Sequence, residues 1–125
     1  MANLSQHRVK AQGNREFLRE IDPLLRGDWA VVVAFYTAVH LVEQLRALAG
    51  CHSKSHQHRL DYIQADHRAI HGDFQRLYFA SRLARYDSNS QFYQQFANAD
   101  IQRVVIDGWL AAVETYVDAL GALTP

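Results

Sequence analysis

The sequence predicts an all-α protein, an up-down antiparallel bundle of four to five helices. Apolar residues recur at spacings of three and four residues, which is typical of helices packed on one face. The β-branched run at residues 30–34 continues into further apolar residues without alternation or a turn, so its length favours a helix over a strand. The 125 residues fit one domain, residues 1–125, whose only prolines are Pro23 and Pro125.

The first predicted helix covers about residues 4–21. Phe17, Leu18 and Ile21 have the spacing of one apolar face, and Pro23 stops propagation. We expect this helix to pack through that face on the rest of the bundle.

The second predicted helix runs from Trp29 to about Leu48. Asp28 is the expected N-cap, and Gly50 stands where a left-handed C-terminal cap is expected. Apolar residues surround nearly the whole circumference, which indicates a central helix covered on several sides.

A short third helix is predicted to start at Ser53 or Ser55 and to bury Leu60, Tyr62 and Ile63. Asp66 can cap a fourth helix over about residues 67–86, although the two segments share a helical phase and can also be one bent helix. The residues of the fourth segment expected to face inward are Ile70, Phe74, Leu77 and Ser81 or Ala84.

Residues 87–97, DSNSQFYQQFA, combine turn formers with Phe92, Tyr93 and Phe96, which predicts a loop packed onto the body. Asn98 or Asp100 then opens a last long helix that ends near Gly121. The residues expected along its buried side are Ile101, Val104, Val105, Trp109, Ala112, Tyr116 and Leu120.

Composition points to a cytoplasmic protein without a membrane span. The chain is 49% hydrophobic and 21% charged, and its single cysteine, Cys51, excludes an intramolecular disulfide. Its N-terminus lacks the apolar core of a signal peptide, and the run Trp29–Val39 is too short and too polar to cross a bilayer.

Charge is balanced overall, with 13 basic and 13 acidic side chains, so no global positive field favours nucleic acid. Residues 51–86, however, carry six basic and three acidic side chains, and residues 87–125 carry one and five. This asymmetry permits an anion-binding surface on the middle segment or contacts of that segment with the acidic end of another copy.

Five of the seven histidines lie in residues 51–71, CHSKSHQHRLDYIQADHRAIH. The pairs His52/His56 and His67/His71 have the four-residue spacing of metal ligands on a helix. Three helical turns, about 16 Å, would separate the pairs, so one shared ion requires a sharp bend near Asp66. Neither HExxH nor CxxC occurs, and we predict no metal or cofactor, while a helical-bundle metal or ligand carrier stays an alternative.

Tyr36, His40 and Glu43 place polar groups on an otherwise apolar helix. Since a buried polar group needs a hydrogen-bond partner, we expect each to meet another helix, either in an internal network or along the wall of a ligand pocket.

A candidate anion site starts at the third helix, where Ser55, His56 and Arg59 can share one side and free backbone N–H groups favour negative charge. On the fourth helix, Arg82 and Arg85, followed by Tyr86, can present two guanidinium groups to a phosphate or to the acidic tail.

The order of features resembles the bacterial HEPN domains over about residues 14–120. The resemblance is carried by WAVVVAFYTAVHLVEQL, then SHQHRLDYI, then LYFASRLARYD, an aromatic-containing loop and a final long helix. It implies an all-α bundle of four or five helices that commonly forms a homodimer. Many HEPN proteins are metal-independent RNA-cleaving enzymes of toxin-antitoxin, phage-defence or RNA-processing systems, whereas others bind nucleotides or scaffold partners.

Active HEPN members carry an Arg, a polar residue and then a His after four to six intervening positions, near the start of a late helix. Here the only literal match, RALAGCH from Arg46 to His52, ends the second helix, and Arg59 to His67 has seven intervening residues. We therefore expect a module that binds a nucleotide, RNA or a protein such as an antitoxin. The alternative is a metal-independent ribonuclease with His56 and Arg59 as catalytic residues and Ser55, Arg82, Arg85, Tyr86, Tyr36, His40 and Glu43 as ligand-binding residues.

Overall fold

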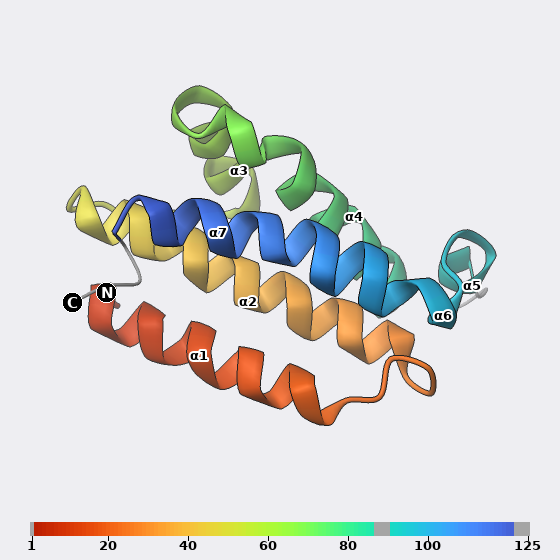
Figure 1. Ribbon diagram of the computed structural model, residues 1–125. Helices are drawn as coiled ribbons and strands as arrows, with labels where there is room; N and C mark the ends of the chain where they lie inside the picture. The colour runs from red at the N-terminus through yellow and green to blue at the C-terminus, as the bar shows by residue number, and fades with distance from the viewer. Residues whose placement is uncertain (1, 87–90, 122–125) are drawn as a thin grey trace.

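Every regular element of the part of the chain that the computed structural model describes, residues 2–86 and 91–121, is a helix (Figure 1). The predicted all-α class is confirmed. The elements are α1 (Leu4–Glu20), α2 (Gly27–Leu48), α3 (His56–Asp66), η1 (Arg68–Ile70), α4 (His71–Tyr86), α5 (Gln91–Gln95), α6 (Asn98–Asp100), η2 (Ile101–Leu110) and α7 (Ala111–Ala119).

Helix α2 is the centre of the molecule, with α1, α4 and the continuous η2–α7 helix packed against it (Figure 1). Side chains are buried around most of its circumference, as its sequence predicted. Its length and composition also fit a membrane span, but 67% of the relevant window is buried inside the protein. A core helix has these same properties, so we assign α2 to the core.

Helix α1 runs antiparallel to α2 and touches it along the narrow stripe of His7, Ala11 and Leu18. Asn3 caps this helix in a capping box with Gln6. Phe17, which was predicted to face inward beside Leu18, is instead 53% exposed. Helix α1 packs mainly on α2 and reaches α7 through the ion pair of Arg15 with Glu114 at 3.2 Å, so its buried stripe is too narrow to include both Phe17 and Leu18.

The start of α2 also differs from the prediction. The helix begins at Gly27, and Arg26 occupies the N-cap position without a side-chain cap. Asp28 lies in the first turn, where its carboxylate pairs with Arg26 at 3.2 Å. Its charge still favours the helix start, because a first-turn carboxylate faces the positive end of the helix dipole.

Helices α3 and α4 are separate. The Ser55 hydroxyl oxygen caps α3 by accepting from the His58 N–H at 3.0 Å, as predicted. Asp66, however, ends α3 instead of capping the next helix, and His67 leaves helical geometry with φ −139° and ψ 49°. The short turn η1 then redirects the chain into α4 (Figure 1).

The inward face predicted for α3 and α4 is observed. Ile63, Ile70, Phe74, Leu77 and Ser81 are buried, and Leu60, Tyr62 and Ala84 pack partly buried against the core.

Within the predicted loop 87–97, residues 87–90 lie outside the described ranges and residues 91–95 form the short helix α5. Phe92 is buried and stacks on Phe96 with ring centroids 5.1 Å apart, so these two rings pack onto the body as expected. Tyr93 differs, with 47% of its surface exposed.

The last long helix begins at α6 and contains a π-helical stretch, η2, before α7. Ile101 and Val105 are buried as predicted, but Ala112 and Leu120 face solvent. The π-helical turns shift the phase, and this displaces part of the predicted apolar face. The helix ends at Ala119 and is followed by Gly121, whose φ of 80°, like the 75° of Gly50, suits glycine.

Candidate anion-binding site

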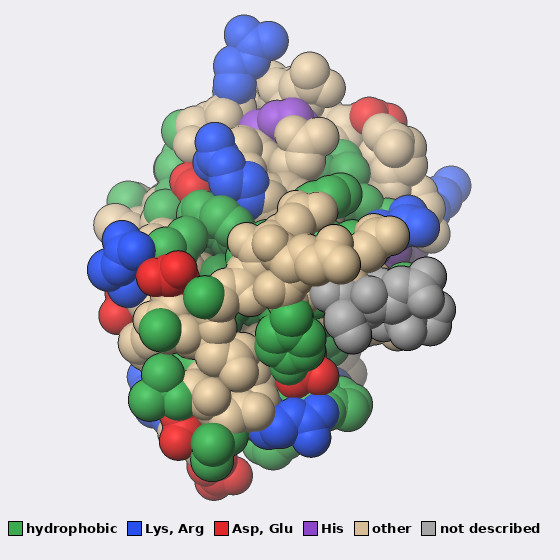
Figure 2. All heavy atoms as spheres, turned by 90° about the vertical axis from the view of Figure 1, so that its right-hand side faces the viewer, with side chains coloured by type: hydrophobic (Ala, Val, Ile, Leu, Met, Phe, Trp, Pro, Cys, Tyr) green, Lys and Arg blue, Asp and Glu red, His purple; other side chains and the backbone are tan. Residues whose placement is uncertain are grey.

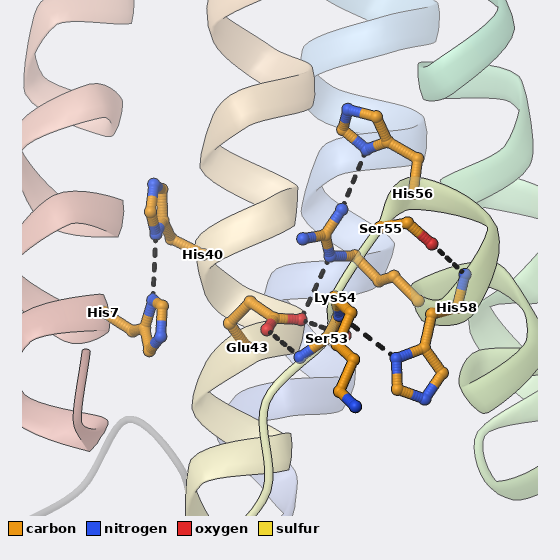
Figure 3. Close-up of polar contacts among 9 residues, drawn as sticks. His7, His40, Glu43, Ser53, Lys54, Ser55, His56 and His58 are labelled. Atoms are coloured by element: carbon orange, nitrogen blue, oxygen red, sulfur yellow. Dashed lines mark hydrogen bonds and ion pairs between the residues drawn. The ribbon is translucent and has the colours of Figure 1, made fainter. Parts of the chain in front are cut away.

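Glu43 of α2 anchors the polar network of the candidate site (Figure 3). Its side chain is 5% exposed and accepts hydrogen bonds from the Ser53 N–H at 2.8 Å, the Ser53 hydroxyl at 2.7 Å and the Arg59 Nε at 3.0 Å. Burial alone would raise the pKa of Glu43, but the bonds from Ser53 and the charge of Arg59 bring it below its ordinary value. The charged carboxylate therefore ties the segment before α3 to α2.

Arg59 links this ion pair to His56. Its Nη1 donates to the Nδ1 of His56 at 2.9 Å. Because a guanidinium group only donates, Nδ1 holds the lone pair and the proton of the neutral imidazole lies on Nε2. Burial, followed by the charges of Arg59, Arg85 and Arg82, lowers the pKa of His56. At neutral pH, His56 thus offers an N–H donor and keeps its basic nitrogen occupied.

The buried ring of Phe35 brings three helices together at the site. His56 of α3, Tyr78 of α4 and the Arg85 guanidinium group lie 5.6, 5.5 and 5.9 Å from the centre of this ring. His56 and Tyr78 also contact each other, with ring centroids 5.4 Å apart. The aromatic cluster therefore places His56 and Arg85 against a common support.

Arg85 and Arg82 bring positive charge to this support. Arg85 donates to the Tyr36 hydroxyl at 2.7 Å and to the Ser81 carbonyl, and its guanidinium carbon lies 5.0 Å from the Tyr86 ring centre. Arg82 is exposed and donates to the Tyr78 hydroxyl at 3.3 Å. Among the described residues, neither arginine pairs with a carboxylate, so both charges stay available to an anion.

A hollow of about 360 Å³ opens beside Arg85, at the end of the molecule that carries the α1–α2 turn. Figure 2 shows this end of the molecule, where hydrophobic, basic and acidic side chains lie side by side on the surface. The residues that line the hollow are Arg26, Asp28, Trp29, Val32, Ala84 and Arg85.

His40 lies apart from the Glu43–His56 network, although it is one turn from Glu43. Its Nδ1 meets the Nδ1 of His7 on α1 at 3.1 Å, and the two rings point toward each other (Figure 3). Burial and the neighbouring charges lower the pKa of His40 to about 4. The structure thus brings His56, Arg59, Glu43, Arg82, Arg85 and Tyr36 together, and leaves His40 in a separate contact.

Two further predicted residues lie at the edge of the site. Ser55 is exposed, and its hydroxyl oxygen is occupied by capping α3. Tyr86 is 70% exposed beside Arg85, where its ring is open to a ligand.

The histidine pairs with metal-ligand spacing do not form sites. His52 precedes α3, so it shares no helix with His56, and His67 uses both ring nitrogens in 2.7 Å hydrogen bonds with the hydroxyls of Tyr62 and Tyr116. Residues 2–86 and 91–121 contain no group of three or more His, Cys, Asp or Glu side chains placed to hold an ion.

Four contributors were not identified from the sequence as part of these contacts: His7, Ser53, Phe35 and Tyr78. His7 stands 33 residues before His40, and Phe35 and Tyr78 look like ordinary core residues. Ser53 carried a signal as a candidate helix cap and Glu43 carried one as a polar residue on an apolar helix, but nothing in the sequence paired the two.

Comparisons with protein-family models, with curated proteins and with solved structures find no match for this chain.

Proposed function

We propose that this protein is a HEPN-like module that binds a phosphate-bearing ligand, a nucleotide or RNA, at the surface formed by His56, Arg82 and Arg85. The observation that carries the proposal is the pair of guanidinium groups without a carboxylate partner in the described ranges, next to a neutral imidazole that offers an N–H. Charge-assisted hydrogen bonds to phosphate are the strongest contacts that such a surface can make.

The neighbouring aromatic residues suit a nucleotide or RNA ligand. Tyr86 is exposed beside Arg85, and Phe79, one turn before Arg82, is 52% exposed. Residues 79, 82 and 86 follow the spacing of one helical stripe, which would alternate rings for base stacking with a cation for the backbone.

We favour binding over catalysis. A ribonuclease that uses His56 as a base needs a free imidazole lone pair, but Arg59 occupies Nδ1 and Nε2 carries the proton. The protein would then act as a binding or regulatory partner in a toxin-antitoxin or phage-defence system in the cytoplasm.

We expect it to work as a homodimer or with an antitoxin or other protein. The exposed apolar side chains around the α1–α2 turn and the adjoining ends of its helices support this expectation, because large apolar groups at a surface favour association. They are Phe17, Leu24, Leu25 and Trp29.

Binding is tested by the fluorescence anisotropy of a labelled single-stranded RNA oligonucleotide and of a labelled adenine nucleotide. Arg82→Ala should weaken binding about tenfold, since it removes one charge-assisted contact. Arg76→Ala is the matched control, because this exposed arginine lies on the same helix and pairs with Asp73 at 3.4 Å. Equal losses in both variants, or no binding by the wild type, would contradict the proposal.

Catalysis is tested separately by incubating the protein with RNA in EDTA. We expect no cleavage. Cleavage that His56→Ala abolishes would establish the alternative, a metal-independent ribonuclease. His56 suits this test because the residue is exposed and does not belong to the apolar core.

A further inference from the structure

His7 and His40 form a contact that the proposed anion site does not use. His7 comes from α1 and His40 from α2, and their Nδ1 atoms lie 3.1 Å apart (Figure 3). His7 is 8% exposed, and His40 is intermediate in exposure. Two imidazoles from different helices are therefore held nitrogen to nitrogen at the surface of the core.

This separation is close to that of two ligands on one ion. Two imidazole nitrogens at the zinc–nitrogen distance of about 2.0–2.1 Å in tetrahedral geometry lie about 3.3 Å from each other. A small rotation of the rings would therefore turn the hydrogen bond into a pair of metal bonds.

The change is balanced in protons. In the neutral pair, one Nδ1 carries the hydrogen and the other accepts it. When both nitrogens ligate an ion, the donor imidazole holds its proton on Nε2 instead, so no net proton is released. Burial lowers the pKa of both histidines, which keeps both imidazoles neutral and able to ligate.

Three other histidines in the described ranges already use ring nitrogens in hydrogen bonds. The Nδ1 of His56 and the Nδ1 of His58 accept hydrogen bonds from Arg59 and from the Lys54 N–H, and His67 has both nitrogens bonded. The His7–His40 contact is the histidine pair whose two ring nitrogens already approach each other.

We propose that His7 and His40 bind one divalent late transition-metal ion, such as Zn²⁺, Ni²⁺ or Cu²⁺, through their Nδ1 atoms, with water at the remaining positions. Affinity should follow the usual order, with Cu²⁺ bound more tightly than Ni²⁺ or Zn²⁺.

Neighbouring charges set the strength of the site. The positive charges of Lys10 and Arg59 act on His40, whereas the negative charge of Glu43 partly offsets them. Because Lys10 repels a cation, Lys10→Gln should tighten binding several-fold. The metal site uses neither Arg82 nor Arg85. The metal proposal can therefore fail while the anion-binding proposal holds, and the reverse.

The experiment is a titration of the metal-free, full-length chain with Zn²⁺ and with Ni²⁺ against a chromophoric competing chelator. We expect one ion per chain, with binding weakened at least tenfold in His7→Gln and in His40→Gln. His71→Gln is the control and should bind like the wild type. Wild-type affinity in either test variant, or absence of stoichiometric binding by the wild type, would overturn the proposal.

A second measurement uses the wild-type chain and does not depend on how the variants fold. Zn²⁺ should shift the imidazole nitrogen resonances of His7 and His40 and leave those of His67 in place. Shifts confined to other histidines would overturn the assignment.

Discussion

Glu43 and Arg59 illustrate how single charged residues hold this molecule together. Their side chains are 5% and 10% exposed, and Ser53 completes the hydrogen bonding of the carboxylate. A buried ion pair contributes little net stability compared with apolar residues, but loss of one partner leaves the other charge buried and unpaired.

Replacing Glu43 by alanine should therefore be costly. We expect Glu43→Ala to lower the free energy of unfolding by about 3 kcal/mol in urea denaturation, because Arg59 is left as a buried charge and Ser53 loses its acceptor. The control Asp100→Asn removes a carboxylate from an exposed ion pair with Arg103. This substitution should change the free energy of unfolding by less than about 0.5 kcal/mol. Similar values for both variants would show that the buried pair does not hold α3 to α2.

The lowered pKa of His40 predicts how the stability of the protein changes at acidic pH. Its pKa falls from 6.5 to about 4 on folding, so below pH 6.5 the unfolded chain binds a proton that the folded chain does not. The free energy of unfolding should decrease as the pH drops from about 6.5 to 4, by at most about 3 kcal/mol from this group. In His40→Gln this part of the decrease, followed by urea denaturation at several pH values, should disappear. An unchanged pH profile would contradict the assignment.

At the scale of the elements, local sequence signals located the helices better than their boundaries. Three capping residues were predicted correctly, because a cap depends only on the nearby backbone: Ser55, Gly50 and Gly121. Asp28 and Asp66 fail as predicted caps because the helices around them start or end with the packing of distant segments. The π-helical stretch has no signature in the apolar pattern.

Alanine substitutions at two glycines should change the stability of the protein in opposite directions. At Gly27, a new Cβ would collide with the Asn98 side chain and lie 3.1 Å from the Ile101 Cγ1, where α6 and η2 approach α2. Gly27→Ala should lower the melting temperature. A Cβ added at Gly13, inside α1, would meet no atom within 4 Å, so Gly13→Ala should raise stability by about 0.5–1 kcal/mol through helix propensity. Thermal unfolding followed by circular dichroism would contradict this view if Gly27→Ala were the more stable variant.

For the molecule as a whole, the sequence predicted the all-α class and the central position of α2, because both follow from apolar periodicity along one chain. It also selected Tyr36, His40 and Glu43 as residues in need of partners, and each has one on another segment: Arg85, His7, and Arg59 with Ser53. Which partner each would meet depends on contacts across 10 to 49 residues, and no local pattern encodes such contacts.

In a chain whose net charge is zero, the described structure brings Arg82 and Arg85, which pair with no carboxylate in the described ranges, close to His56. His56, Arg82 and Arg85 converge from α3 and α4 onto the Phe35 and Tyr78 rings. The proposal of a phosphate-bearing ligand rests on this convergence more than on any single residue.

The most direct test of that claim is the salt dependence of RNA binding. The affinity of the wild type for a single-stranded RNA oligonucleotide should fall with NaCl concentration, and Arg82→Ala combined with Arg85→Ala should reduce the slope of log Kd against log [NaCl] by roughly 1 to 1.5. The double variant Arg76→Ala with Arg103→Ala removes the same charge from arginines paired with Asp73 and Asp100 and should keep the wild-type slope. Equal slopes in both double variants would contradict an anion site at His56, Arg82 and Arg85.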